Sequence, residues 1–150
     1  VEGPQVIEFN VRLGDPEAQV VLPMVEDELA PVLEAAARGT LETASLARSG
    51  DCYVGIVLAS GGYPGSYQTG AQIEGLEVAS ACEEVLVFHA GTKLRDGEIV
   101  TTGGRVLTVV ARGGNMAEAI DRAYAAESRI TFIDKQVRTD IGRRVTDAHF

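Results

Sequence analysis

Apolar and polar side chains alternate strictly through residues 7–12, IEFNVR. The apolar residues take every second position, and Glu8, Asn10 and Arg12 take the others. Because successive side chains of a strand point to opposite faces, this pattern predicts a β-strand with one apolar and one polar face. We expect the apolar face to pack in a core. The polar face is either solvated surface or part of a functional site.

Helical signals follow this stretch. Asp15-Pro16 is typical of a helix start, with Asp15 at the N-cap and Pro16 at the first helical position. Pro23 would break a longer helix, so the sequence predicts one helix over residues 16–22 and a second over residues 27–38, closed by Gly39. Residues 40–52 are expected to form a connection.

The character of the chain changes at about residue 50. Short β-branched runs separated by glycine-rich turns predict an antiparallel, barrel-like unit. Residues 114–130 predict one main amphipathic helix, in which Asn115 and Glu118 have the spacing of a capping box. Another strand is expected near residues 129–133. The predicted fold class is α+β, with one unit over residues 1–50 and a second over residues 51–150.

One glycine-rich segment is GGYPGSY, residues 61–67. Pro64-Gly65 suits the centre of a type II turn, and Gly61 and Gly62, just before Tyr63, allow the backbone to approach a ligand closely. The segment is therefore either a hairpin turn whose two tyrosines cover a small core, or a loop that closes over an active site.

A second glycine-rich segment, TTGGRVL, spans residues 101–107. Gly103 and Gly104 expose backbone N–H groups before a strand, and Arg105 adds a guanidinium fork, which together make an anion site. The alternative is a hairpin turn that carries a surface arginine.

Composition narrows the classes of partner. The chain has 150 residues and a formal net charge of −9, which argues against general binding to nucleic acid or to anionic membranes. An acidic total does not exclude a local basic pocket. Cys52 and Cys82 are expected to be reduced thiols of a cytoplasmic protein, and no stretch has the length of a membrane span or the features of a signal peptide. Since a strong strand pattern begins within a few residues of Val1, we expect the chain to be the C-terminal part of something longer.

Five segments in this order carry a family resemblance: VIEFNVRLGDPEAQVVLP, LASGGYPGSYQTG, VFHAGT, TTGGRVLTVVARG and RTDIGRRV. They resemble the phosphoribosylamine–glycine ligase (glycinamide ribonucleotide synthetase) family of the ATP-grasp superfamily. The resemblance implies the last part of an ATP-grasp core, an antiparallel strand then helices, followed by the family's C-terminal domain. It also implies an ATP-dependent ligase of purine biosynthesis, which joins glycine to 5-phosphoribosylamine through glycyl phosphate. Such an enzyme would need an N-terminal remainder that is absent from this chain.

The resemblance also implies roles for the polar face of the first strand. Glu8 and Asn10 match metal ligands of the family, for Mg²⁺ or Mn²⁺ beside ATP. Arg12 would face the acyl phosphate, or else pair with a neighbouring acid. Asp15 would orient the attacking amine, in competition with its N-cap role. These residues are the expected metal and catalytic positions.

For the second unit, similarity to sister enzymes implies that Gly103, Gly104 and Arg105 hold the 5′-phosphate of the substrate. Gly62 and Tyr63 would belong to a loop that closes over the active site. Two other functions stay open, namely another purine-pathway ATP-grasp ligase or carboxylase, and a non-catalytic binding or assembly module.

Overall fold

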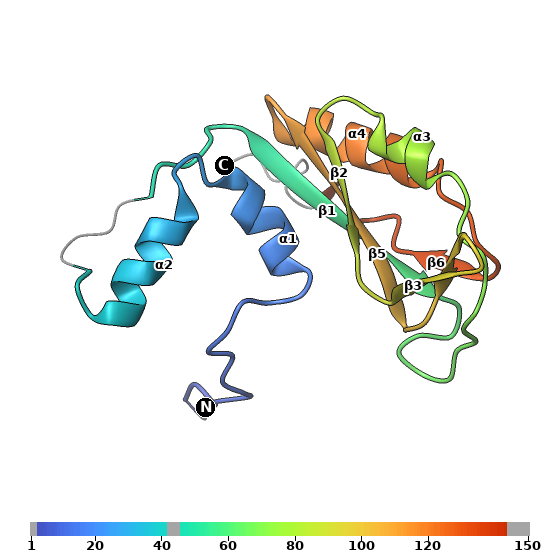
Figure 1. The fold of residues 1–150 in the computed structure, drawn as a ribbon, viewed down its shortest axis with the longest axis horizontal. Coiled ribbons are helices and arrows are strands. Elements are labelled where there is room, and N and C mark those ends of the chain that lie inside the picture. Colours follow the sequence, from blue (N-terminus) through green and yellow to red (C-terminus); the bar gives the residue numbers. More distant parts are fainter. Residues whose placement is uncertain (1–2, 42–45, 144–150) are drawn as a thin grey trace.

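A computed structural model describes residues 3–41 and 46–143 as a mixed α/β structure (Figure 1). The helices are α1 (Glu17–Val21), the 3₁₀ turn η1 (Leu22–Met24), α2 (Leu29–Arg38), α3 (Leu76–Ser80) and α4 (Met116–Glu127). The strands are β1 (Cys52–Ser60), β2 (Val85–His89), β3 (Thr92–Arg95), β4 (Glu98–Thr101), β5 (Arg105–Gly113) and β6 (Lys135–Val137).

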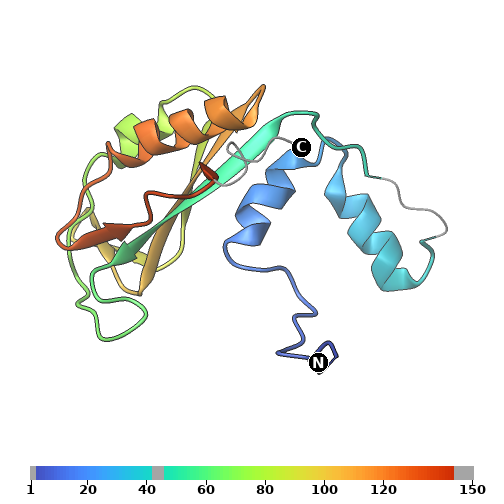
Figure 2. The same cartoon turned by 180° about the vertical axis from the view of Figure 1, so that it is seen from behind.

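The main sheet has four antiparallel strands in the order β2-β5-β1-β6. Helix α4 covers one face, and α1 lies against the other, as the two opposite views show (Figures 1 and 2). Alternate residues of β1 account for this. Ile56 is fully buried in the core beneath α4, whereas Gly55 faces the side chain of Val20 on α1. The sheet therefore lies between two helical layers of unequal size.

The core lies between the sheet and α4. Ala119, Ala123 and Ala126 on α4 are fully buried against Ile56 and Val109 of the sheet. Small side chains on the helix allow it to pack close to the β-branched strand residues.

The start of α4 is held by two side-chain hydrogen bonds to backbone amides. The Asn115 Oδ1 accepts from the backbone N–H of Glu118 at 3.0 Å, and the Glu118 carboxylate accepts from the N–H of Gly114 at 2.8 Å. The predicted main helix and its capping signal are confirmed.

The sequence predicted a barrel-like unit, but the described strands do not close into a barrel. Strands β3 and β4 form a separate two-stranded sheet, and the four-stranded sheet ends at β2 on one side and β6 on the other.

The strand predicted near residues 129–133 is not formed. Thr131 makes an isolated bridge to Glu74, and β6 begins only at Lys135. Local β-propensity marked the extended backbone here, but not the residues that find a pairing partner.

Both early helices are present, with shifted starts. The first is α1 followed by η1, which contains Pro23, and the second is α2, which begins at Leu29. Gly39 ends α2 in the left-handed conformation, with φ of 68°, as its position predicts. No helix in the described parts of the chain is both long and apolar enough to span a bilayer.

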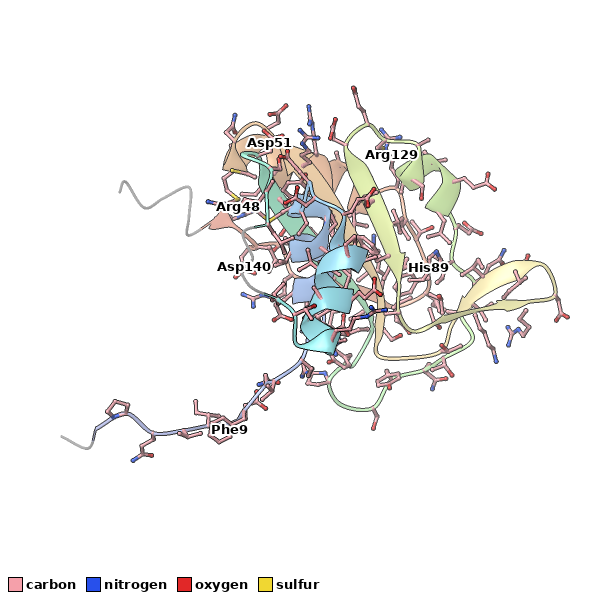
Figure 3. The ribbon with its side chains drawn as sticks, turned by 60° about the vertical axis from the view of Figure 1, so that its left-hand side comes forward. Phe9, Arg48, Asp51, His89, Arg129 and Asp140 are labelled. Atoms are coloured by element: carbon pink, nitrogen blue, oxygen red, sulfur yellow. The ribbon has the colours of Figure 1, made fainter. Side chains whose placement is uncertain are left out.

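The predicted strand over residues 7–12 is not formed. The segment has no regular secondary structure and pairs with no other described strand, and Figure 3 shows Phe9 on a stretch that runs away from the body of the molecule. The side chains of Ile7, Phe9 and Val11 are 97%, 83% and 93% exposed. A strand needs neighbouring backbone to satisfy its amide and carbonyl groups, and the described residues supply none here.

Candidate functional site

Two residues from distant parts of the chain form an ion pair at one end of the sheet. Arg105 begins β5, and its Nη2 lies 2.9 Å from the Oδ2 of Asp15, just before α1. Both side chains are a little over two-fifths exposed. Arg105 pairs in register with Ala59 of β1, and α1 packs against β1 and β5, which brings Asp15 to the start of β5.

The predicted N-cap role of Asp15 is wrong. Helix α1 begins at Glu17, Pro16 takes the N-cap position, and no side chain caps the helix. The Asp15 carboxylate is instead committed to other donors, since its Oδ1 accepts from Gln19 Nε2 at 2.8 Å while Oδ2 meets Arg105. A charged donor and an amide donor together outweigh a backbone cap.

Gln19 was missed by sequence reasoning, although its spacing four residues after Asp15 is one at which side chains on a helical turn meet. Its Nε2 is committed to Asp15, and its Oε1 is buried without a hydrogen-bond partner among the described residues. The amide orientation is therefore set by the carboxylate.

The Gly103-Gly104 pair is held by the end of β1. The Ser60 hydroxyl donates to the Gly103 carbonyl at 2.9 Å, and the Ser60 N–H donates to the Gly104 carbonyl at 2.8 Å. A β-carbon at Gly104 would overlap the ring of Tyr63 and approach Tyr67. The missing side chain of Gly104 thus makes room for an aromatic ring, which places Tyr63 beside the segment that carries Arg105.

The GGYPGSY turn differs from the expected type II turn. The N–H of Gly65 donates to the carbonyl of Gly62 at 2.7 Å, so Tyr63 and Pro64 take the central positions, joined by a cis peptide bond. Gly62 has φ of 94°, a conformation that other residues rarely adopt. The rings of Tyr63 and Tyr67 lie 6.2 Å apart between centroids. The loop and the Gly103–Arg105 segment therefore form one continuous surface.

The other predicted site residues stay apart from this surface. Glu8, Asn10 and Arg12 are exposed, and no contact joins any of them to Arg105 among the described residues. Arg12 Nη1 donates to the Leu13 carbonyl at 3.1 Å and makes no ion pair in the described parts of the chain. Glu8 and Asn10 offer two oxygen donors of the kind that Mg²⁺ and Mn²⁺ accept. No group of three acidic, histidine or cysteine side chains that fits a metal occurs in the described residues.

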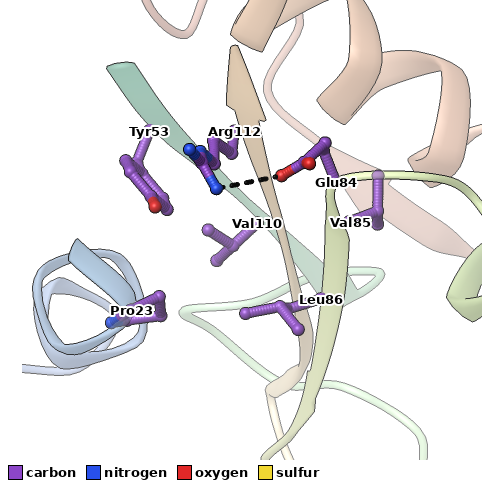
Figure 4. Close-up of a pocket in the computed structure, with 7 residues that line it drawn as sticks. All are labelled: Pro23, Tyr53, Glu84, Val85, Leu86, Val110 and Arg112. Atoms are coloured by element: carbon purple, nitrogen blue, oxygen red, sulfur yellow. Dashed lines mark ion pairs between the residues drawn. The ribbon is translucent and has the colours of Figure 1, made fainter. Parts of the chain in front are cut away.

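A groove that the sequence did not indicate lies on the α1 face of the sheet. It has a volume of about 330 Å³ and is lined by Pro23, Tyr53, Glu84, Val85, Leu86, Val110 and Arg112 (Figure 4). Arg112 pairs with Asp51 at 2.5 Å and with Glu84 at 3.6 Å. The hydrogen bond and charge of Asp51 raise the pKa of the Arg112 guanidinium above its ordinary value. Because both carboxylates already neutralise Arg112, the groove is a weak candidate for an anion.

Residues 53–144 match the family model described as "Phosphoribosylglycinamide synthetase, C domain". The chain belongs to this family. The phosphoribosylglycinamide synthetase C domain thus begins within β1 and includes the glycine-rich turn, Arg105 and α4.

Relatives of this C-domain chain extend the match beyond the family model. A phosphoribosylamine–glycine ligase of Agrobacterium fabrum is 47% identical over 141 residues, which cover 94% of this chain and 33% of the relative. A chloroplastic phosphoribosylamine–glycine ligase of Arabidopsis thaliana is 50% identical over 143 residues, which cover 94% of this chain and 27% of the relative. The chain spans about a third or less of the length of these relatives.

A solved structure supports the fold. The crystal structure of a phosphoribosylamine–glycine ligase from Thermotoga maritima matches with a TM-score of 0.75 at 34% identity, over 91% of this chain and 33% of that one. This chain therefore shares its mixed architecture, with antiparallel sheets, with one third of the Thermotoga maritima ligase. The roles expected for individual site residues stay predictions.

Proposed function

We propose that this chain is the C-terminal part of an ATP-dependent ligase that joins glycine to 5-phosphoribosylamine in purine biosynthesis. The observation that carries the proposal is the length of the match. Relatives named for this activity align over 94% of the chain, whereas the C-domain model starts only at residue 53. The match thus includes most of the segment with Glu8, Asn10, Arg12 and Asp15 as well as the C domain.

In this proposal, residues 1–50 complete an ATP-grasp core and residues 51–150 form the C-terminal domain. The partner is the N-terminal remainder of the same enzyme, which would be about twice as long as this chain, given the 33% coverage of the relatives. Exposed Ile7, Phe9 and Val11 support such a partner, because a contiguous apolar stripe is costly in water.

The chemistry assigned to the whole enzyme has two steps. The γ-phosphoryl group of ATP passes to the glycine carboxylate, which gives glycyl phosphate and ADP. The amine of 5-phosphoribosylamine then attacks the acyl carbon and releases phosphate. The donor types of Glu8 and Asn10 fit part of a Mg²⁺ or Mn²⁺ shell, and the remaining ligands would come from phosphates and the rest of the enzyme. A metal bound there would neutralise charge on the transferred phosphoryl group.

The other residues take roles that follow from their chemistry. Arg12 is an exposed guanidinium on the same segment and suits the acyl phosphate. Asp15 offers a carboxylate to the attacking amine. Arg105, with the Gly103 and Gly104 amides, suits the 5′-phosphate. Neither amide donates a hydrogen bond to another described residue, but Gly104 is buried beside the Tyr63 ring, so the half-buried Gly103 supplies the more accessible amide.

The test uses a complete ligase that contains this chain, with ADP release followed at varied glycine and 5-phosphoribosylamine. We expect turnover that requires both substrates, and none from the 150-residue chain alone. Glu8→Gln should lower kcat sharply without loss of fold, since a ligand facing a bridging metal acts mainly as charge develops during transfer.

Normal turnover of the Glu8→Gln variant across a Mg²⁺ titration would contradict the proposal that Glu8 is a metal ligand. Absence of any ligase activity from a well-folded complete protein would favour a binding or assembly module instead.

A further inference from the structure

The Asp15–Arg105 ion pair creates a conflict within the proposed function. Arg105 is assigned to a substrate phosphate, yet the Asp15 carboxylate already lies 2.9 Å from its Nη2. A phosphate at the same guanidinium would meet a carboxylate at close range, and two anions repel. Either Asp15 moves when the phosphate arrives, or Arg105 binds no phosphate.

The surroundings of Asp15 are consistent with movement. The residue precedes α1 and is held by Arg105 and by the Gln19 amide at 2.8 Å, while its side chain keeps 44% exposure. Half-exposed ion pairs contribute little net stability, because water solvates both charges well. An arginine–phosphate contact carries more charge and can be bidentate, so it is the stronger interaction.

The Gln19 amide adds a second argument. Its Oε1 is buried and unpartnered while its Nε2 is committed to Asp15. A buried acceptor without a donor is unfavourable, so the contact that holds Asp15 against Gln19 includes one unsatisfied polar atom.

We propose that Asp15 is a displaceable counter-ion of Arg105. This inference rests on the proposed phosphate role of Arg105. The substrate phosphate exchanges with the Asp15 carboxylate on the guanidinium, and the freed carboxylate then becomes available to the amine of the same substrate. Phosphate recognition and amine orientation are in this way coupled through one ion pair between the start of α1 and the start of β5.

The experiment measures binding of ribose 5-phosphate to the complete ligase by calorimetry, because this probe carries the phosphate without the amine. Asp15→Asn should tighten binding about two- to fivefold, the range expected when a half-exposed competing ion pair is removed. Arg105→Ala should weaken binding at least about tenfold. In the double variant, Asp15→Asn should have no further effect. With 5-phosphoribosylamine, Asp15→Asn should lower KM and kcat together.

Glu17→Gln is the matched control, because it removes one negative charge two residues away and Glu17 makes no ion pair with Arg105 in the described parts of the chain. Its ribose 5-phosphate affinity should change less than that of Asp15→Asn. Unchanged or weaker binding in Asp15→Asn, with Arg105→Ala still defective, would overturn the counter-ion role alone. Unchanged binding in Arg105→Ala would overturn the phosphate role and the inference with it.

Discussion

Replacement of Lys135 by methionine tests the contact that fastens β6 to the end of α4. The Lys135 Nζ lies 2.6 Å from the Glu127 carboxylate and donates to the Ile130 carbonyl at 2.7 Å. The two charged side chains keep only 20% and 11% exposure. Methionine fills a similar volume but supplies no donor, so the change leaves a nearly buried carboxylate and a backbone carbonyl without their partner.

The magnitude follows from this geometry. Loss of one partner of a fully buried ion pair costs about 3–5 kcal/mol, and the residual exposure here allows partial solvation. We therefore expect unfolding free energy to fall by about 2–4 kcal/mol.

The assay is thermal and denaturant unfolding of the complete protein, with Lys93→Met as the control. Lys93 is exposed on β3, so the same substitution there should change the unfolding free energy by no more than about 0.5 kcal/mol. Adding Glu127→Gln to Lys135→Met should recover part of the loss, because the unpaired charge is removed. Equal effects of Lys135→Met and Lys93→Met would refute the assigned role of the buried pair.

Two further predictions concern activity and backbone conformation. Arg105→Ala should lower kcat/KM for 5-phosphoribosylamine about ten- to hundredfold, from a charge-assisted hydrogen bond of about 1.5–3 kcal/mol, with little change in KM for ATP or glycine in steady-state kinetics. Equal losses for all three substrates would indicate a structural role. Gly75→Ala should lower unfolding free energy by more than about 2 kcal/mol, because Gly75 has φ of 81° and a β-carbon would collide with the Arg129 carbonyl. Gly50→Ala, where a β-carbon meets nothing, should be nearly neutral in the same unfolding assay.

Local signals were sufficient for the main helix and for the end of α2. The Asn115 side chain accepts from the N–H of Glu118 three residues later, the Glu118 carboxylate accepts from the N–H of Gly114, and Gly39 directly follows the helix that it ends. In both cases the residues that determine the element lie within one helical turn of it. Nothing from the rest of the fold is needed to place them.

The candidate site could be predicted only residue by residue. Asp15 and Arg105 were each recognised as charged residues with a role, but they lie 90 positions apart, and the register of β1 with β5 decides that they meet. Gly104 shows the same limit. Its sequence context predicts a backbone N–H exposed to an anion, whereas the Tyr63 ring, from a turn about 40 residues earlier, lies against Gly104. Packing between residues far apart in the chain determines these contacts, and the spacing of residues in the sequence does not predict such packing.

The alternation over residues 7–12 determines which side chains share a face of a strand, but not which strand it pairs with. Ile7, Phe9 and Val11 are almost wholly exposed, so the pattern cannot be explained by any contact within the described chain. A strand that buries these three residues must turn the intervening side chains to its opposite face, because successive side chains alternate. In the proposed ligase, docking of the N-terminal remainder would thus do two things at once: cover the apolar stripe and align Glu8, Asn10 and Arg12 on one rigid surface. Assembly of the strand and assembly of the proposed metal ligands are then the same event, which is why ligase activity is expected from the complete enzyme and not from this chain alone.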